Sequence, residues 1–214
     1  MLQKHYWLSR WLLLLILTGA VWFPARPVWA DIAQIKPGIY MAGIPTDQFQ
    51  FFAAPEGAGR QRSANWCWAA CIQMVLNYKG LYITQEEIVT KVYGQLIDQP
   101  AGPQQIMQAL NGWAPDRNGG YAAVVADPYN LGGPALVTDL ANRYPLIVGL
   151  KGNPVGHAYV LTGVTYRVDP YNNPIFNSVV LRNPWPGSPS REELSWQEFM
   201  SRVMFTTRVH ILRL

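Results

Sequence analysis

The sequence predicts an α+β fold in which an N-terminal helical half packs on a C-terminal antiparallel β-sheet. Helical spacing of apolar residues is concentrated in about residues 65–144, and strand-like apolar runs dominate from 146 to 212. Helices and strands that are segregated along the chain favour this class over an alternating parallel fold. A length of 214 residues with 50% hydrophobic composition suits one compact domain and excludes a disordered chain.

Residues 1–30 are expected to be a signal peptide outside the fold. Lys4 and Arg10 make the start positive, and 13 uncharged residues lie between Arg10 and Pro24 before the small Ala30. This run is shorter than the ~20 residues that span a bilayer. We therefore expect an exported protein, periplasmic or secreted, with no stable membrane span after cleavage, whose residues 31–214 form a single domain.

The charge balance argues against a nucleic-acid partner. The whole chain has 17 basic and 13 acidic residues, but Lys4, Arg10 and Arg26 lie in the expected signal peptide. Residues 31–214 then have 14 basic and 13 acidic residues, a net charge of +1. A nearly neutral domain lacks the basic surface that phosphate groups require.

Local signals place the elements in order. Residues 31–59 are rich in Gly, Pro and Ala and predict short extended pieces and loops. Helix signals follow, which include a capping box at Thr84–Glu87 and a glycine at position 80 placed as a cap. The predicted helices begin near residues 65, 84, 103 and 133, and the first runs to about Tyr78.

Apolar strand patterns follow the helices. The predicted strands are 146–150, 157–166, 177–182 and 207–212. A turn cluster at 169–174 joins two of them as a hairpin. A second capping box at 195–198 predicts a short helix through Met204. The stretch 112–133 is expected to be rich in loops.

The two cysteines are expected to behave differently. Cys67 and Cys71 are four residues apart on one predicted helix, which places their Cβ atoms roughly 5–6 Å apart. A disulfide needs about 3.5–4.5 Å, so no bridge is expected. Cys67 lies at the helix N-terminus, where the helix dipole favours a thiolate and lowers the pKa. Cys71 is expected to be a small buried residue, which is also the alternative for Cys67.

A nucleophilic cysteine needs a base, and residues 31–214 contain two histidines. His157 follows a Gly-rich loop and opens a predicted strand, where a rigid ring can face a cleft. His210 is expected to be a half-buried strand residue. Asn183 ends another strand and could orient the imidazole of His157. The alternative for Asn183 is an ordinary Asn-Pro turn.

These residues resemble the papain-like cysteine peptidases. That family has a Gln six residues before a Cys-Trp-Ala that opens a long helix, as Gln61 precedes Cys67-Trp68-Ala69 here. It has a His-Ala at the start of a strand, matched by His157-Ala158, and an Asn followed by Trp, matched by Asn183-Pro184-Trp185. The chain is similar to compact bacterial members, including bacteriocin-leader-processing peptidases and secreted effector proteases.

The resemblance implies a papain-like fold, a protein or peptide substrate and a role for each matched residue. Cys67 would attack a carbonyl carbon, with His157 as its partner and general acid. Asn183 would orient His157. The side-chain amide of Gln61 and the backbone N–H of Cys67 would donate to the oxyanion.

Two tryptophans would support these residues. Trp185 would cover the hydrogen bond between His157 and Asn183, and Trp68 follows the nucleophile. The chain departs from plant and lysosomal members, which have several disulfides and a Gly-Ser-rich approach to the nucleophile. It also lacks room for their long helical propeptide before Cys67.

The leading hypothesis is therefore an exported cysteine peptidase. Motifs for other chemistries, such as His-Glu-x-x-His or a phosphate-binding Gly loop, are not found in residues 31–214, so no cofactor or metal is expected. Two alternatives remain: an acyltransferase or transamidase with the same triad, and a catalytically inert binding module of the same fold.

Overall fold

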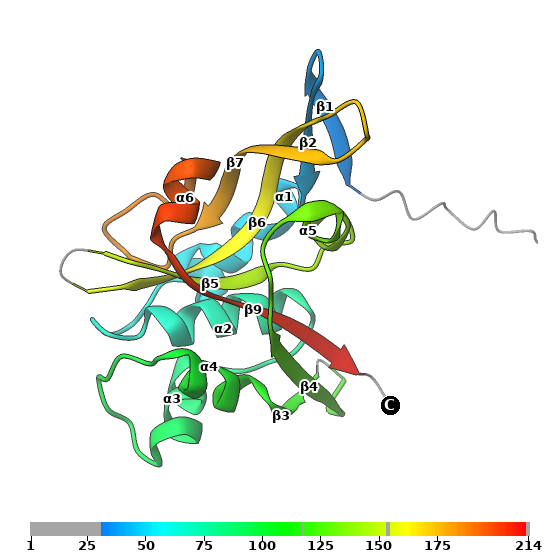
Figure 1. Cartoon of the computed structure of the whole chain (residues 1–214). Coiled ribbons are helices and arrows are strands. Elements are labelled where there is room, and N and C mark those ends of the chain that lie inside the picture. Colours follow the sequence, from blue (N-terminus) through cyan, green and yellow to red (C-terminus); the bar gives the residue numbers. More distant parts are fainter. Residues whose placement is uncertain (1–30, 117, 153–154, 213–214) are drawn as a thin grey trace, which may run out of the picture.

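The computed structural model describes residues 31–116, 118–152 and 155–212, and the expected signal peptide, residues 1–30, lies outside them. The described chain forms a nine-stranded sheet with helices against both faces (Figure 1). Every strand pairing in it is antiparallel. The predicted α+β class with an antiparallel sheet is confirmed, but the order is less segregated than expected, because four of the strands come before the first four predicted helices or between them.

The segment 31–59 is more ordered than its composition predicts. Strands β1 (Ile32–Lys36) and β2 (Ile39–Gly43) form a hairpin, and β2 pairs with β6 in the main sheet. A Cβ at Gly43 would lie 2.5 Å from the carbonyl oxygen of Thr162, so only glycine permits this approach. Short helical turns follow: α1 (Thr46–Phe49), η1 (Gln50–Ala53) and η2 (Pro55–Gly57).

The predicted helices are found close to their expected starts. They are α2 (Cys67–Tyr78), α3 (Gln85–Tyr93), α4 (Pro103–Leu110), α5 (Gly133–Ala141) and α6 (Trp196–Arg202). The capping box at Thr84 and Glu87 is formed in full. At α6 only half of the box is formed: Ser195 accepts from the Glu198 N–H, while the Glu198 carboxylate pairs with Arg202. The helix ends at Arg202, before the predicted Met204, because the chain there enters β9.

The remaining strands of the described chain number seven, and the sequence did not predict three of them. The seven are β3 (Gly112–Pro115), β4 (Tyr121–Pro128), β5 (Leu146–Leu150), β6 (His157–Val168), β7 (Pro174–Arg182), β8 (Arg191–Ser195) and β9 (Val203–Leu212). β3 and β4 lie in the stretch expected to be loops, and β8 had no predicted strand. β6 is central, since β5 and β2 pair along one edge and β7 along the other.

Two apolar cores lie on the two faces of the sheet. Along β5, Ile147 belongs to the core with α2, α3 and α4, while Leu146 and Val148 belong to the core with α5 and α6. Trp68 to Leu76 of α2 are all buried, so this helix lies within the first core instead of on its surface. α2 packs against β5 and β6. Among the described helices, none is long and apolar enough to cross a membrane.

Candidate active site

The start of α2 and the start of β6 meet at one cavity. Cys67 is the first residue of α2 and His157 is the first of β6, and both line a cavity of about 240 Å³. Its other walls are mainly apolar and include Ile106, Val155 and Phe205. The structure therefore brings the predicted nucleophile and the predicted base together beside a space that is suited to an apolar side chain.

The imidazole of His157 is held through one of its two ring nitrogens. Its Nε2 atom lies 2.9 Å from Oδ1 of Asn183, and its ring contacts the Tyr159 ring edge-on with centroids 4.8 Å apart. The Trp185 ring lies 6.3 Å from the imidazole, also edge-on, and is 43% exposed. Since Nε2 is engaged by Asn183, the other ring nitrogen, Nδ1, is the one available to Cys67.

Asn183 is fixed through every polar group it has. Its backbone N–H donates to Ser190 (2.9 Å), and its carbonyl accepts from Nη1 of Arg60 (2.7 Å). Its side-chain Oδ1 also accepts from the backbone N–H of Trp185 (2.8 Å), and its Nδ2 donates to Oε1 of Glu192 (2.5 Å). Asn183 is 4% exposed, so this is not a surface turn residue. Sequence reasoning missed Glu192, for which no motif gave a signal.

The Cys67 pKa is shifted opposite to the expected direction. Burial raises the pKa of the thiol above its ordinary value, and hydrogen bonds from the backbone N–H groups of Ala158, Trp68 and Cys67 itself lower it only in part. Burial also lowers the pKa of His157, against the opposing effects of the hydrogen bond that its ring donates to Asn183 and of the charge of Glu192. Both shifts favour the neutral thiol and the neutral imidazole when no substrate is bound. The predicted lowering at the helix terminus is outweighed by desolvation.

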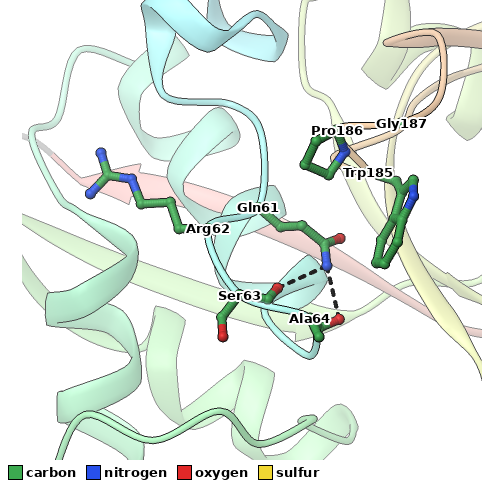
Figure 2. Close-up of a pocket in the computed structure, with 7 residues that line it drawn as sticks. All are labelled: Gln61, Arg62, Ser63, Ala64, Trp185, Pro186 and Gly187. Atoms are coloured by element: carbon green, nitrogen blue, oxygen red, sulfur yellow. Dashed lines mark hydrogen bonds between the residues drawn. The ribbon is translucent and has the colours of Figure 1, made fainter.

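The side-chain amide of Gln61 is occupied within its own loop. Its Nε2 donates to the carbonyl oxygens of Ser63 and Ala64, each at 2.9 Å, as Figure 2 shows. Its Oε1 is buried and has no hydrogen-bond partner within the described chain. Gln61 lines a second hollow of about 270 Å³ with Trp185, and not the cavity of Cys67. To donate to an oxyanion, Nε2 must first release one of the two carbonyls.

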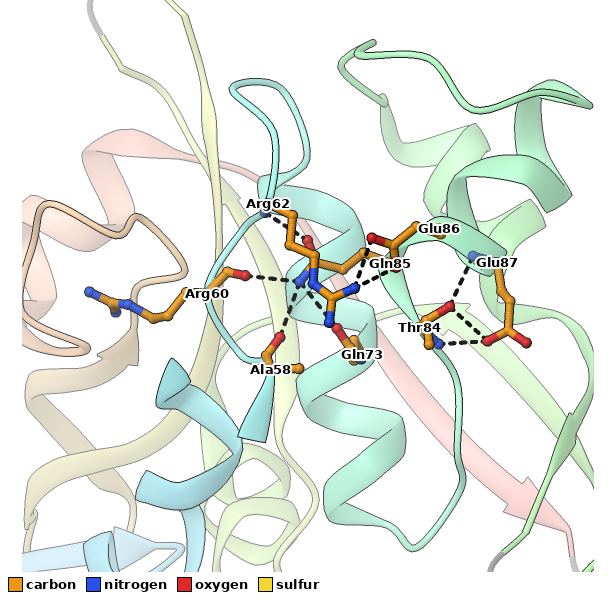
Figure 3. A network of polar contacts seen from close by, with 8 residues as sticks. All are labelled: Ala58, Arg60, Arg62, Gln73, Thr84, Gln85, Glu86 and Glu87. Carbon is orange, nitrogen blue, oxygen red and sulfur yellow. Dashed lines mark hydrogen bonds and ion pairs between the residues drawn. The ribbon is translucent and has the colours of Figure 1, made fainter. Parts of the chain in front are cut away.

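A buried glutamine holds the loop that carries Gln61. Nε2 of Gln85 lies within hydrogen-bond distance of the carbonyl oxygens of Ala58 (3.1 Å) and Arg60 (2.9 Å), and its Oε1 accepts from the backbone N–H of Arg62 (Figure 3). Gln85 is fully buried at the start of α3. It therefore ties the approach to the nucleophile to the helical half, a role that the sequence did not reveal.

The other residues singled out in the sequence have structural positions. Trp68 is 1% exposed, and its Nε1 donates to the carbonyl of Gln99 (3.1 Å). Cys71 is fully buried, both cysteines are free, and burial raises the Cys71 pKa well above its ordinary value. His210 is half-buried on β9 with Nε2 3.1 Å from Oδ1 of Asp127, as expected of a strand residue. Among the described residues, no group of three His, Cys, Asp or Glu side chains is arranged to hold a metal ion.

Comparison with known proteins adds a family. Residues 49–204 match the sequence profile of the family described as "Papain-like cysteine protease AvrRpt2". No protein with a curated description matches the chain.

Solved structures of peptidase domains are also similar, each over 72% of this chain at 16% identity. They are a double glycine motif protease from an AMS/PCAT transporter in complex with the leader peptide, with a TM-score of 0.45 over 89% of that chain; the peptidase domain of Streptococcus ComA, with a TM-score of 0.48 over 96%; and that of Streptococcus mutans ComA, with a TM-score of 0.42 over 97%.

Proposed function

We propose that Cys67, His157 and Asn183 are the catalytic triad of this chain, which belongs to the AvrRpt2 family of papain-like cysteine proteases and is therefore a cysteine peptidase. The observation that supports this most is the shared cavity of Cys67 and His157, with His157 held by Asn183 at 2.9 Å. The nucleophile, the base and the group that orients the base follow the arrangement that thiol acyl transfer requires.

The chemistry begins from the neutral pair. When a peptide carbonyl enters the cavity, the sulfur of Cys67 attacks its carbon, and the thiol proton passes to Nδ1 of His157. The carbonyl electron pair moves onto oxygen and then returns as the C–N bond breaks. The leaving amine takes the proton from Nδ1. Water then attacks the thioester with His157 as base, which releases the acid and restores the thiol.

The oxyanion needs donors that are preorganised at the start of α2. The N–H of Cys67, at the first helical position, has no carbonyl acceptor within its own helix and lies beside its own thiol, and so we assign it this role. Gln61 supplies the second donor once its Nε2 leaves the carbonyl of Ser63 or Ala64. Gln61 is only 5% exposed, so its side-chain amide stays packed against the loop that leads to Cys67.

The substrate is proposed to be a protein or peptide with an apolar side chain next to the cleaved bond. The cavity beside Cys67 is lined by apolar groups such as Ile106, Val155, Met204 and Phe205. Burial of one apolar side chain of medium size there is worth about 1.5–3 kcal/mol. A peptide library is expected to show this preference.

Export is proposed from the sequence of residues 1–30 and is supported by the position of Asp31. The N–H of Asp31 donates to the carbonyl of Ala141 (2.8 Å), the last residue of α5, and its carboxylate pairs with Arg143. Cleavage after Ala30 would place the new ammonium group at a helix C-terminus, which stabilises positive charge. The N-terminal sequence of the exported protein should begin at Asp31. An exported protein that still carries residues 1–30 would contradict this.

Peptide hydrolysis is tested by three single variants. Cys67→Ala and His157→Ala should abolish cleavage of casein and of a peptide library, while Cys71→Ala should keep it. Equal activity in all three would overturn the assignment. An added amine nucleophile should leave hydrolysis as the main outcome, and a dominant amide product would favour acyl transfer instead.

A further inference from the structure

Three neighbouring strands place three polar side chains in a row. One residue beyond the Val160–Arg182 pair of β6 and β7, Asn183 lies opposite Tyr159, so His157 is its diagonal neighbour on the same face. On its other side, the backbone N–H of Asn183 donates to Ser190, which makes Glu192 the diagonal neighbour on β8. The sheet therefore aligns His157, Asn183 and Glu192.

The hydrogen-bonding capacities of these groups leave one arrangement. A carboxylate accepts and does not donate, so the Asn183 group that faces Glu192 must be the NH₂ of Nδ2, at 2.5 Å. The backbone N–H of Trp185 donates and does not accept, so the Asn183 atom that faces it must be Oδ1, at 2.8 Å. The two contacts lie on opposite ends of the amide and require the same orientation of it.

This orientation determines the protonation of His157. Since Oδ1 faces Nε2 of the imidazole at 2.9 Å, Nε2 must carry the hydrogen, and in the neutral ring Nδ1 then keeps its lone pair. The lone pair is what the thiol of Cys67 needs for proton transfer. Burial lowers the pKa of His157, and the negative charge of Glu192 opposes this lowering, which favours the imidazolium that forms when the proton arrives.

We propose that Glu192 is a positioning residue of the active site, which acts through Asn183 to hold His157 in its Nε2–H form. This inference rests on the proposed catalytic triad. The neighbouring Glu193 makes only structural contacts among the described residues, with the Ser178 hydroxyl (2.7 Å) and with Arg191 (3.5 Å). Glu193→Gln is therefore a matched control of the same residue type on the same strand.

The test is a rescue experiment on the pair. Asn183→Asp places a second carboxylate against Glu192, and like charges at this distance repel strongly. We expect it to lower kcat/KM by roughly 100-fold. Adding Glu192→Gln supplies an NH₂ group that donates to the new carboxylate, and should restore kcat/KM to within about tenfold of wild type. Adding Glu193→Gln instead should restore nothing.

A spectroscopic readout separates this inference from the triad itself. In a Cys67→Ala background, which needs no peptidase activity, nitrogen NMR at alkaline pH should show His157 protonated at Nε2. Glu192→Ala leaves the Trp185 N–H as the only one of the two contacts that orients the amide, and so should increase the share of the Nδ1–H tautomer, while Glu193→Gln should leave the spectrum unchanged. An unchanged His157 tautomer in Glu192→Ala, or equal rescue by both glutamine variants, would overturn the proposal. An inactive wild-type enzyme with the expected tautomers would overturn the proposed triad alone.

Discussion

His157 and Asn183 are joined by a hydrogen bond of 2.9 Å between Nε2 and Oδ1, although 26 residues separate them in the chain. The bond bridges the first residue of β6 and the residue just after β7, so it depends on the register of the two strands. The geometry of the base is thus a property of the sheet, while the nucleophile belongs to a helix.

Removing the amide of Asn183 should affect chemistry more than binding. We expect Asn183→Ala to lower kcat by about 10–100-fold with little change in KM, because the imidazole loses its orientation but the cavity stays intact. Steady-state kinetics on one peptide checks this. Asn177→Ala, within the strand β7 that leads to Asn183, is the control, since the Asn177 Nδ2 has no hydrogen-bond partner among the described residues. An equal loss in both variants would show a general effect on β7.

Alkylation should report the raised pKa of Cys67. Because burial favours the neutral thiol, the rate of reaction with iodoacetamide should keep rising as pH increases through the ordinary thiol range of about 8–9. Cys71 should stay unmodified in the folded protein because it is fully buried. Mass spectrometry of the labelled peptides separates the two sites. A rate that is already at its plateau at acidic pH would instead indicate a preformed thiolate–imidazolium pair.

Gln61 should affect both rate and stability. Gln61→Ala leaves the carbonyls of Ser63 and Ala64 without their donor, which should lower the free energy of unfolding by about 1–3 kcal/mol. It should also slow acylation by about 100-fold through the lost oxyanion donor. Urea unfolding and burst kinetics measure the two effects separately. Gln104→Ala, at an exposed position of α4, should change neither. Loss of stability with normal acylation would remove Gln61 from the oxyanion site.

Gln85 should matter for stability more than the ion pair beside it. Gln85→Ala removes the buried amide that holds Ala58, Arg60 and Arg62, and we expect a loss of about 2–3 kcal/mol in the free energy of unfolding. The exposed pair of Arg62 and Glu86 should contribute less than about 1 kcal/mol, so Glu86→Ala is the control. Similar losses in both variants would mean that the buried amide contributes no more to the free energy of unfolding than the exposed ion pair does.

The sequence predicted those elements whose signals are local. α2, the capping box of α3 and strands β5 and β6 follow from periodicity, caps and apolar runs. β8 was missed because its residues Arg191–Ser195 have little intrinsic strand preference, and it is held by its pairing with β7. β3 and β4 were missed because their alanines and flanking glycines resemble a loop, although β9 completes them as a sheet.

The active site, too, could be predicted from the sequence only in part. Cys67, His157 and Asn183 could be proposed from residue types and order, and the structure brings them to one place. The pKa of Cys67 could not be predicted, because its burial depends on β6 packing over the helix terminus. Neither the partners of Gln61 nor the position of Glu192 follows from a pattern, since each depends on how loops and strands meet in three dimensions.

The placement of the two sulfur atoms has a consequence for oxidative damage. The chain has two cysteines, and Cys71 lies fully buried within the helix that begins with Cys67. When Cys67 is oxidised to a sulfenic acid, no second thiol of the protein can condense with it without unwinding of α2. The enzyme therefore has no internal route of repair, and its recovery depends on small thiols supplied from its surroundings.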